Sequence, residues 1–334
     1  MRIISKTDIN NLLVGSTFYG TGGGGSPRLA KKIYQSLSNK PIKLKSINEF
    51  QPDALFITTY TIGGLSQKLI KKSIFDQAQL IYQKYLNIKI AGIIPVEIGP
   101  LSLALAIKMA VRLNLPLIDA DFVGGRSTPE VFLETITFYN IPRSPLLVIN
   151  NQGNYQILKS SKDHLEEETF LRQFAEKSGG FALVLGYPIT QKIAIKTLVE
   201  KTVSMAIKTG VKLNQKKSVG KLLFTGIISK IELFKKKAFT AKLIEITNKN
   251  SVAKLYLKNE NLIFWINDKP VLTCPDLIIL LDKENKPIFN LNLKLNQKVS
   301  VIGLPAPTLW RSQKGLKLFN PKLFGFNFKP KLLS

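Results

Sequence analysis

The sequence is poor in the residues that build most metal sites and nucleophile sites. Its 334 residues contain one cysteine, Cys274, and one histidine, His164. A single cysteine excludes an intramolecular disulfide framework and fits a reducing cytoplasm. A zinc site of the usual type needs more histidine and cysteine than the chain has, and Ser-His-Asp or Cys-His catalysis would have to use His164. Carboxylate acid–base chemistry is what remains.

Long apolar runs are missing as well. No stretch approaches the roughly 20 uncharged apolar residues that cross a bilayer. The N-terminal MRIISKTDINNLL has neither an apolar run flanked by basic residues nor a cleavage site of small residues. We therefore expect no membrane span and no signal peptide. With 45% hydrophobic residues, the chain is expected to fold into a globular cytoplasmic protein, long enough for two domains.

Positive charge is abundant, but arginine is scarce. The formal net charge is +26, and most of it comes from lysines that are spread singly along the chain. Arginine is the residue preferred for bidentate contacts to bases and phosphates. We therefore interpret the charge as solvated lysine-rich faces and expect neither nucleic acid nor a membrane as a partner. A nucleic-acid-associated C-terminal region stays open as an alternative.

Glycine is concentrated near the start of the chain. A glycine-rich segment precedes Ser26 and Pro27, which are typical of a helix N-cap and first helical position. Because the backbone N–H groups of such a loop are exposed, it binds anions well, although a tight structural turn is the alternative. It is neither a P-loop nor a dinucleotide fingerprint, since no Gly-Lys-Ser/Thr follows and it joins two expected helices. The candidate substrate-binding residues of this segment are Gly20, Thr21, Gly22, Gly23, Gly24 and Gly25.

Strand, glycine turn and helix alternate between residues 54 and 130. Strands are expected at 54–60, 89–95 and 117–120, and helices at 66–85 and 101–113. This repeat predicts a mainly parallel sheet with helical crossovers, whose strand ends share one edge. The polar and glycine residues that would converge at that edge are Thr58, Thr59, Gly63, Gly64, Glu97, Asp119 and Asp121.

The stretch LPLIDADFVGGRSTPE, residues 115–130, is the densest set of candidate site residues. Asp119 and Asp121 are two residues apart, so both would emerge on one face if the strand continues that far. A Gly-Gly pair and Arg126 follow, and Pro129 is expected at the first position of a helix. An acid-rich loop with a helix cap is the alternative interpretation.

The pattern changes again toward the C-terminus. The expected elements are a hairpin from 145–150 and 155–159, a helix at 162–177, a strand at 181–186 and helical pattern up to about 213. His164 would lie in the first turn of its helix, where an exposed or capping role is expected. Only strand-length runs follow residue 217. We therefore predict an α/β domain at 1–214 and a mainly β domain at 215–334.

Six segments, distributed in order over nearly the whole chain, carry a resemblance to a known family. They are GTGGGGSP at 20–27, PVEIG at 95–99, LPLIDADFVGGRSTPE at 115–130, PDLIILLDKENKPIFNLNL at 275–293, and the closing PTLWR and FGFNF. Together they resemble the family named for S-methyl thiohydantoin desulfurase, long catalogued as a domain of unknown function beside hydantoinases and oxoprolinases. The resemblance implies an α/β N-terminal domain and a β-rich C-terminal domain, in agreement with the patterns above.

The resemblance also implies a reaction on a small hydantoin- or thiohydantoin-like ring. Water attacks the ring carbon that bears the S-methyl group, methanethiol leaves, and a hydantoin remains. This chemistry needs a base for the water, donors that hold the substrate and an acid for the leaving group. For proton transfer or metal binding we select Asp119, Asp121 and Glu97. Arg126 would hold a substrate carboxylate in bidentate fashion, and the amides of residues 20–25 would line an anion pocket.

Some points stay open at this level. A divalent cation such as Mg²⁺ has candidate ligands in Glu97, Asp119, Asp121 and Glu130. The chain has Pro100 and Ser102 where the family continues with Gly and Asn, and FVGG at 122–125 where Gly-Met-Gly is common; these changes lie beside the expected pocket. The alternative function is a non-catalytic ligand-binding or accessory subunit of a hydantoinase/oxoprolinase-type system. Expected partners are a small-molecule substrate, a second copy of the chain and a protein of such a system.

Overall fold

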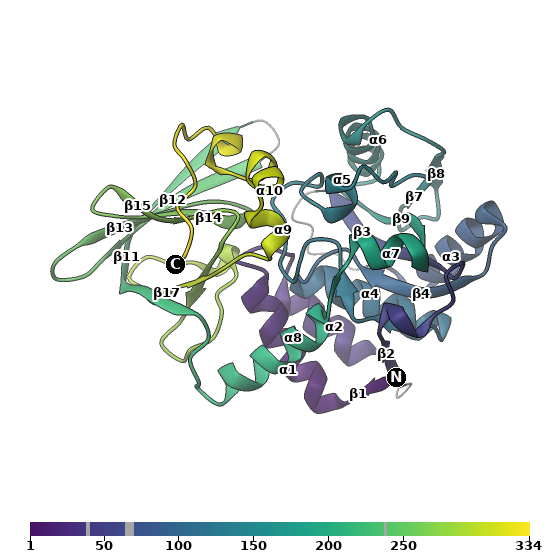
Figure 1. The fold of residues 1–334 in the computed structure, drawn as a ribbon, viewed down its shortest axis with the longest axis horizontal. Helices are drawn as coiled ribbons and strands as arrows, with labels where there is room; N and C mark the ends of the chain where they lie inside the picture. The colour runs from purple at the N-terminus through teal and green to yellow at the C-terminus, as the bar shows by residue number, and fades with distance from the viewer. Residues whose placement is uncertain (38–40, 64–69, 237–238) are drawn as a thin grey trace. The chain divides into compact units, whose positions relative to one another are not determined.

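The structure is a computed structural model that describes residues 1–37, 41–63, 70–236 and 239–334 (Figure 1). The chain divides into two compact units. The α/β unit comprises Met1–Ile9, Gly25–Gly125 and Glu130–Ser204, and the β unit comprises Asn10–Gly24, Arg126–Pro129 and Met205–Ser334. Neither unit is one continuous stretch of chain, whereas the domains predicted at 1–214 and 215–334 are each continuous.

An eight-stranded sheet forms the centre of the α/β unit, in the order β1-β2-β5-β4-β3-β9-β7-β8. The strands are β1 Arg2–Ile4, β2 Ile42–Lys45, β3 Leu55–Gly63, β4 Ile90–Pro95, β5 Leu117–Ile118, β7 Leu146–Ile149, β8 Tyr155–Leu158 and β9 Phe181–Thr190. The pairings among β2, β5, β4 and β3 are parallel. The remaining pairings are antiparallel, so the sheet is mixed. The predicted α/β class, with parallel strands joined by helices, is confirmed.

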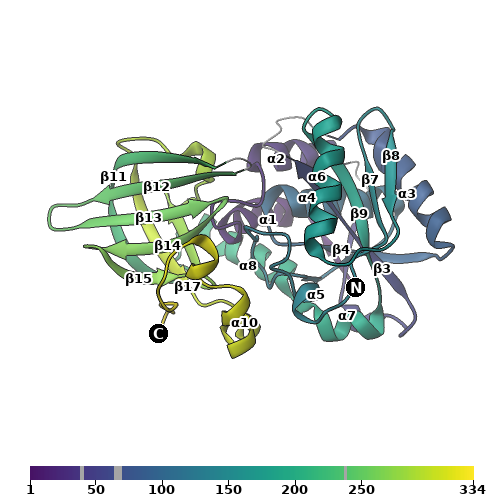
Figure 2. The same ribbon diagram turned by 90° about the horizontal axis from the view of Figure 1, so that it is seen from above.

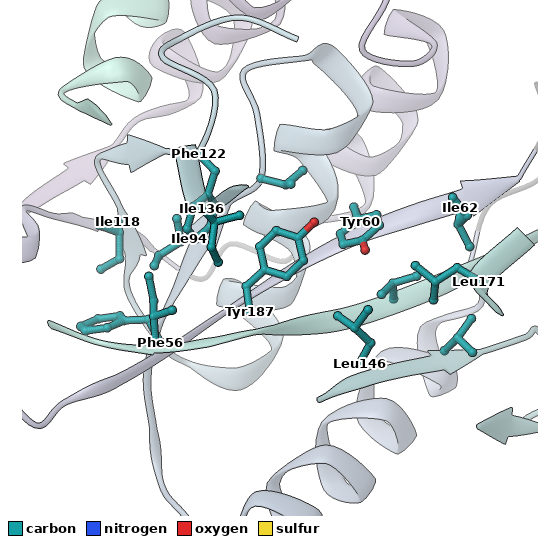
Figure 3. Packing of buried hydrophobic residues seen from close by; sticks show 14 of the residues in the cluster. Phe56, Tyr60, Ile62, Ile94, Ile118, Phe122, Ile136, Leu146, Leu171 and Tyr187 are labelled. Atoms are coloured by element: carbon teal, nitrogen blue, oxygen red, sulfur yellow. The ribbon is translucent and has the colours of Figure 1, made fainter. Parts of the chain in front are cut away.

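Helices cover both faces of this sheet (Figure 1). The helices of this unit are α2 Pro27–Ser36, α3 Lys72–Leu86, α4 Pro100–Leu113, α5 Thr135–Phe138, α6 His164–Lys177 and α7 Gln191–Thr197, with the 3-10 turn η1 Ile47–Glu49. A buried cluster packs residues of α6 and α7 against one face of β3, β4 and β9. Helices α3 and α4 contact the sheet but add nothing to this cluster, so they lie on the other face. Figure 3 shows part of the cluster, with Tyr187 lying between Phe122 and Tyr60.

Three local predictions differ from the structure. For the helix expected at 66–85, residues 66–69 lie outside the described residues; Lys71 is extended, and α3 runs from Lys72 to Leu86. The strand expected at 117–120 is interrupted at Asp119: β5 stays in the large sheet, while β6, Ala120–Asp121, pairs with β10, Val199–Glu200. The strand therefore does not continue through Asp119 and Asp121, which was the condition for both acids to emerge on one face.

The helix expected to begin at Pro129 is absent, and residues 129–134 are irregular. In an α-helix, the carbonyl of Val131 would accept a hydrogen bond from the N–H of Thr135. Here the Thr135 N–H donates to the Phe122 carbonyl at 2.6 Å, and the Val131 carbonyl accepts from Arg143 at 2.9 Å instead. Helix α5 therefore begins only at Thr135 and has four residues.

The β unit contains a seven-stranded antiparallel sheet in the order β15-β14-β13-β12-β11-β17-β16, in which β11–β15 run side by side (Figure 2). Its strands are β11 Lys221–Lys236, β12 Phe239–Thr247, β13 Val252–Lys258, β14 Glu260–Ile266, β15 Lys269–Thr273, β16 Leu277–Leu281 and β17 Lys298–Leu304. One face of this sheet carries a buried cluster of aliphatic and phenylalanine side chains. The predicted mainly β C-terminal region is confirmed.

Two longer helices accompany the β sheet. Most residues of α1, Lys6–Tyr19, and of α8, Thr202–Asn214, belong to the β unit. The helices touch backbone to backbone, because a Cβ atom on Gly15 would lie 1.8 Å from the Ala206 carbonyl oxygen. A Cβ on Gly210 would meet the Asn11 carbonyl oxygen equally closely. The short helical elements of the C-terminal part are η2 Asn290–Asn292, α9 Thr308–Arg311, α10 Gln313–Leu318 and η3 Pro321–Phe324.

Candidate active site

Glu97 lies just beyond β4, at the edge where the parallel strands of the α/β unit end. The chain turns there into α4, whose first turn begins with Pro100. Glu97 is 8% exposed, and its Oε1 accepts a hydrogen bond of 2.7 Å from the Ser102 hydroxyl. Ser102, one of the positions at which the chain departs from the expected pattern, therefore holds the predicted catalytic carboxylate.

A second acid, Glu134, is brought beside Glu97 by backbone pairing. The Phe122 N–H donates to the Val96 carbonyl at 3.2 Å, and the Phe122 carbonyl accepts from the Thr135 N–H at 2.6 Å. The segments that carry Glu97, Asp121 and Glu134 are thereby joined. Glu134 is 2% exposed, and the negative charge of Glu97 acts on its carboxyl group.

One buried arginine, Arg143, lies near two acids of this region, Glu134 and Glu167. Arg143 Nε forms an ion pair of 2.8 Å with Glu167 Oε2, and Arg143 Nη1 lies 3.7 Å from Glu134 Oε2. Arg143 is also fixed by the Val131 carbonyl, and Glu167 by the Ser161 hydroxyl at 2.6 Å. The guanidinium therefore forms its close ion pair with Glu167 and only a long, weak contact with Glu134.

Two tyrosines complete the cluster, and a β-bulge directs one of them into it. The register of β3 and β9 shifts between Phe56 and Thr58, so that Tyr187 and Pro188 lie opposite the single residue Ile57, and Tyr187 has a φ of 55°. A left-handed backbone is unfavourable for a large side chain, and bulges commonly redirect a side chain beside functional sites. The Tyr187 ring packs against Phe122 at 5.4 Å and against Tyr60 at 5.8 Å between centroids (Figure 3).

The cluster holds polar atoms that are buried without a well-formed hydrogen bond. Within the described part of the chain, Glu134 Oε2 and the Tyr187 hydroxyl are two such atoms. Burial raises the pKa of Glu134 to about 8, although Arg143 and the Tyr187 hydroxyl lower it. Burial also raises the pKa of Tyr187 and of Tyr60. Near neutral pH, most of the Glu134 carboxyl groups therefore hold a proton.

Asp121 is fully buried and organises its own loop. Its carboxylate accepts hydrogen bonds from the N–H groups of Val123, Gly124 and Gly125, at 3.3, 3.0 and 2.8 Å. Burial raises the pKa of Asp121 to about 7, while these N–H groups and Thr202 lower it. The side chain thus stabilises the glycine turn that follows it.

Asp119 is half-buried and holds the start of α8. Its carboxylate accepts a hydrogen bond from the Ser204 N–H at 2.9 Å and one from the Ser204 hydroxyl at 2.5 Å. Its carbonyl accepts from the Lys201 N–H at 2.6 Å. These bonds satisfy groups that a helix leaves open at its N-terminus, which is a capping role.

The glycine segment forms a tight turn after α1, and residues 20–24 belong to the β unit. A Cβ on Gly22 would lie 2.2 Å from Asn290 Oδ1, and one on Gly23 would lie 2.2 Å from Glu260 Oε1. At Gly22, whose φ is 87°, a side chain would be strained and would displace Asn290, and at Gly23 it would displace the end of Glu260. Thr21 is buried, Gly20 accepts a hydrogen bond from Ser127, and Gly25 lies against Leu101 in the α/β unit. Binding of an anion by residues 20–25 stays a prediction.

The candidate residues of β3 serve its pairing with β9. Thr58 and Thr59 are fully buried within the strand, and the Thr59 hydroxyl donates to the Val184 carbonyl at 3.0 Å. A Cβ on Gly63 would lie 2.1 Å from the Gly180 carbonyl oxygen. Gly64 lies outside the described residues. Substrate binding by Thr59, Gly63 and Gly64 stays a prediction.

Arg126 is fully buried within the β unit. Its guanidinium donates to the carbonyls of Ser127 and Pro275 and lies 5.0 Å from the centre of the Phe319 ring. These contacts stabilise packing inside that unit. Glu130 belongs to the α/β unit and is partly buried. Substrate binding by Arg126 and by Glu130 stays a prediction.

Two family models match the chain. The S-Me-THD-like N-terminal domain matches residues 7–160, and the S-Me-THD-like C-terminal domain matches residues 161–332. The chain belongs to the S-Me-THD-like family. A crystal structure of a protein from Chromobacterium violaceum matches 100% of this chain and 100% of its own, with a TM-score of 0.85 at 20% sequence identity. At that identity the likeness shows the fold alone. A search of curated proteins finds no match.

In this S-Me-THD-like chain, sequence reasoning missed most of the buried cluster. Glu97 was selected, but Glu134, Arg143, Glu167 and the two tyrosines were not. One signal was present: Glu134 stands between Leu133 and the apolar residues of α5, where an unpaired acid is costly. Across the described residues, no three His, Cys, Asp or Glu side chains come close enough together to hold a metal ion. A bound divalent cation stays a prediction.

No helix in the described part of the chain is both long enough and apolar enough to cross a membrane.

Proposed function

We propose that this S-Me-THD-like chain is a hydrolase of a small hydantoin- or thiohydantoin-like ring. Water would attack the ring carbon that bears the S-methyl group. A C–O bond forms, the C–S bond breaks, one proton passes to a base, and the thiolate leaves as methanethiol after taking up a proton. The family supports the reaction class, and the buried cluster of the α/β unit supports the acid–base chemistry.

The observation that carries the proposal is the buried carboxyl group of Glu134, whose pKa burial raises to about 8, beside the Tyr187 hydroxyl. Both polar atoms are buried and lack a well-formed hydrogen bond in the described structure, which is costly unless a ligand supplies partners. A neutral carboxyl group offers one donor and one acceptor, and a cyclic amide presents the complementary pair at its edge. Glu134 would donate a hydrogen bond to a ring nitrogen and make the adjacent carbon more electrophilic.

Glu97 is the carboxylate best placed to accept the proton of water. It ends a strand of the same sheet, and its Oε1 is held by Ser102. One hydrolysis requires both an acid and a base, and Glu134 and Glu97 would supply them. Asp119 and Asp121 were candidates for the same work. Their oxygens accept backbone N–H groups of α8 and of the glycine turn, and we assign both residues to holding those elements.

The test is release of methanethiol from S-methylated thiohydantoins by the purified chain. It is run after chelation and again with Mg²⁺, Mn²⁺ or Zn²⁺, which tests the predicted cation. We expect Glu134→Gln to lower the rate by at least about 100-fold, because an amide holds the ring but cannot transfer a proton. The matched control is Glu176→Gln, an exposed position of α6.

Two outcomes contradict parts of the proposal. A Glu134→Gln variant as fast as the unmodified chain removes Glu134 from the reaction. Ring binding without release of thiol under any metal condition identifies the chain instead as a ligand-binding or accessory subunit of a hydantoinase/oxoprolinase-type system.

A further inference from the structure

The protonated state of Glu134 depends on what surrounds it, and those surroundings contain a cation. The titratable groups that act on Glu134 are Arg143, Glu97, Glu167, Tyr60 and Tyr187. A guanidinium close to a carboxyl group favours the ionised form, and an ionised Glu134 would no longer donate a proton. The position of Arg143 therefore decides whether Glu134 can act as an acid.

The structure shows Arg143 held on the side of Glu167. The Nε–Oε2 distance to Glu167 is 2.8 Å, whereas the Nη1–Oε2 distance to Glu134 is 3.7 Å. Glu167 lies in the first turn of α6, where the helix dipole favours a negative charge, and Ser161 donates to its second oxygen. The side chains of Glu134, Arg143 and Glu167 are buried, so solvent screens the interactions between them little.

We infer that Glu167 is a positioning residue of the site: by holding Arg143, it leaves Glu134 as an uncharged proton donor. Glu167 needs no contact with the substrate for this role. The spectroscopic part of the inference concerns the α/β unit alone. Only its kinetic part rests on the function proposed above.

The experiment removes the charge of Glu167 and keeps its shape. In Glu167→Gln, Arg143 loses its closest anion and turns toward Glu134, and the repulsion between two carboxylates disappears. Both changes favour ionised Glu134. The probe is the infrared C=O band of a protonated carboxyl group, assigned by its loss in Glu134→Gln and titrated from pH 5 to pH 10 in the full chain.

We expect the midpoint of this band to fall by about one pH unit or more in Glu167→Gln, a tenfold change in proton affinity. The control Glu176→Gln removes the same charge from an exposed position of α6 and leaves the midpoint unchanged. Glu167→Asp keeps the charge but shortens the side chain, and it gives a smaller fall in the same direction. This milder variant decides the question if the glutamine variant does not fold.

Kinetics provides a separate readout. If the chain releases thiol, the alkaline limb of its pH–rate profile moves to lower pH in Glu167→Gln by the same amount as the band. If it releases none, the proposed function fails, while the infrared titration still decides the role of Glu167. An unchanged or raised midpoint in Glu167→Gln or Glu167→Asp overturns the inference, as does a band already absent from the unmodified chain at pH 7.

Discussion

Replacement of Glu134 by glutamine makes protein stability less dependent on pH. In the folded chain, the pKa of Glu134 is raised to about 8, whereas its ordinary value is 4.5. Between these two values the folded state holds one proton more than the unfolded state. The free energy of unfolding therefore falls as pH rises, and the loss is complete above about pH 8. Glutamine does not titrate, so the variant lacks this contribution.

The size of the effect follows from the width of that interval. One extra bound proton changes the free energy of unfolding by about 1.4 kcal/mol per pH unit. From pH 5 to pH 7, the Glu134→Gln variant should gain about 2.5 kcal/mol over the unmodified chain, slightly less than two full pH units of effect because the unfolded state is still partly protonated at pH 5. Asp121, whose pKa is also raised by burial, contributes a slope of its own, but it is present in both proteins and cancels.

The assay is urea unfolding between pH 5 and pH 9 at constant ionic strength, followed by far-ultraviolet circular dichroism. The matched variant Glu176→Gln should track the unmodified chain at every pH. Stability curves of Glu134→Gln and the unmodified chain that stay parallel from pH 5 to pH 8 would refute the reasoning. They would mean that Glu134 titrates at an ordinary pH and is not desolvated.

Three further predictions concern single side chains. Gly15→Ala should lower the free energy of unfolding by about 3 kcal/mol, because the added Cβ would lie 1.8 Å from the Ala206 carbonyl oxygen. An unchanged urea midpoint would disprove the close contact between α1 and α8. Tyr187→Phe should leave stability unchanged or raise it by about 1 kcal/mol, since the buried hydroxyl makes no well-formed hydrogen bond, while release of thiol falls. Retention of full activity in that variant would exclude the hydroxyl from the reaction. Asp119→Ala should lower the free energy of unfolding by about 1 kcal/mol, because it removes the hydrogen bonds that cap α8. Amide hydrogen exchange should rise first at the start of that helix, and unchanged exchange there would contradict the capping role.

Sequence reasoning succeeded where local chemistry decides the structure. Ser26 and Pro27 were predicted to begin a helix, and Ser26 does cap α2. The alternation of apolar strands with helices located β3, β4 and α4 to within a few residues. It also implied that neighbouring strands would be parallel, and β3, β4 and β5 are. In each case the residues that predict the element lie close together in the sequence.

Prediction failed where a distant residue decides the local structure. Pro129 is a good first residue for a helix, but Arg143 takes the Val131 carbonyl and Phe122 takes the Thr135 N–H. Asp119 and Asp121 have the spacing of one strand face, but β6 leaves the sheet to pair with β10. The spacing of residues within a segment does not reveal such distant partners, whether Arg143 and Phe122 or the strand β10.

The buried cluster was beyond local prediction for the same reason. Glu134, Arg143 and Glu167 come from an irregular segment, a loop and a helix, and only the folded sheet brings them together. Tyr187 enters the cluster through a bulge, which no apolar periodicity reveals. Of the acids chosen from the sequence, Glu97 is the one that lies beside this cluster.

The central claim is that Glu134 holds a proton at neutral pH and delivers it during hydrolysis of the ring. The most direct measurement is the rate of thiol release from an S-methylated thiohydantoin between pH 6 and pH 10, for the unmodified chain and for Glu134→Gln. The rate of the unmodified chain should fall above about pH 8, approaching a tenfold loss per pH unit, and the variant should be at least about 100-fold slower at pH 7. A variant that retains the full rate and the same pH profile would contradict the claim.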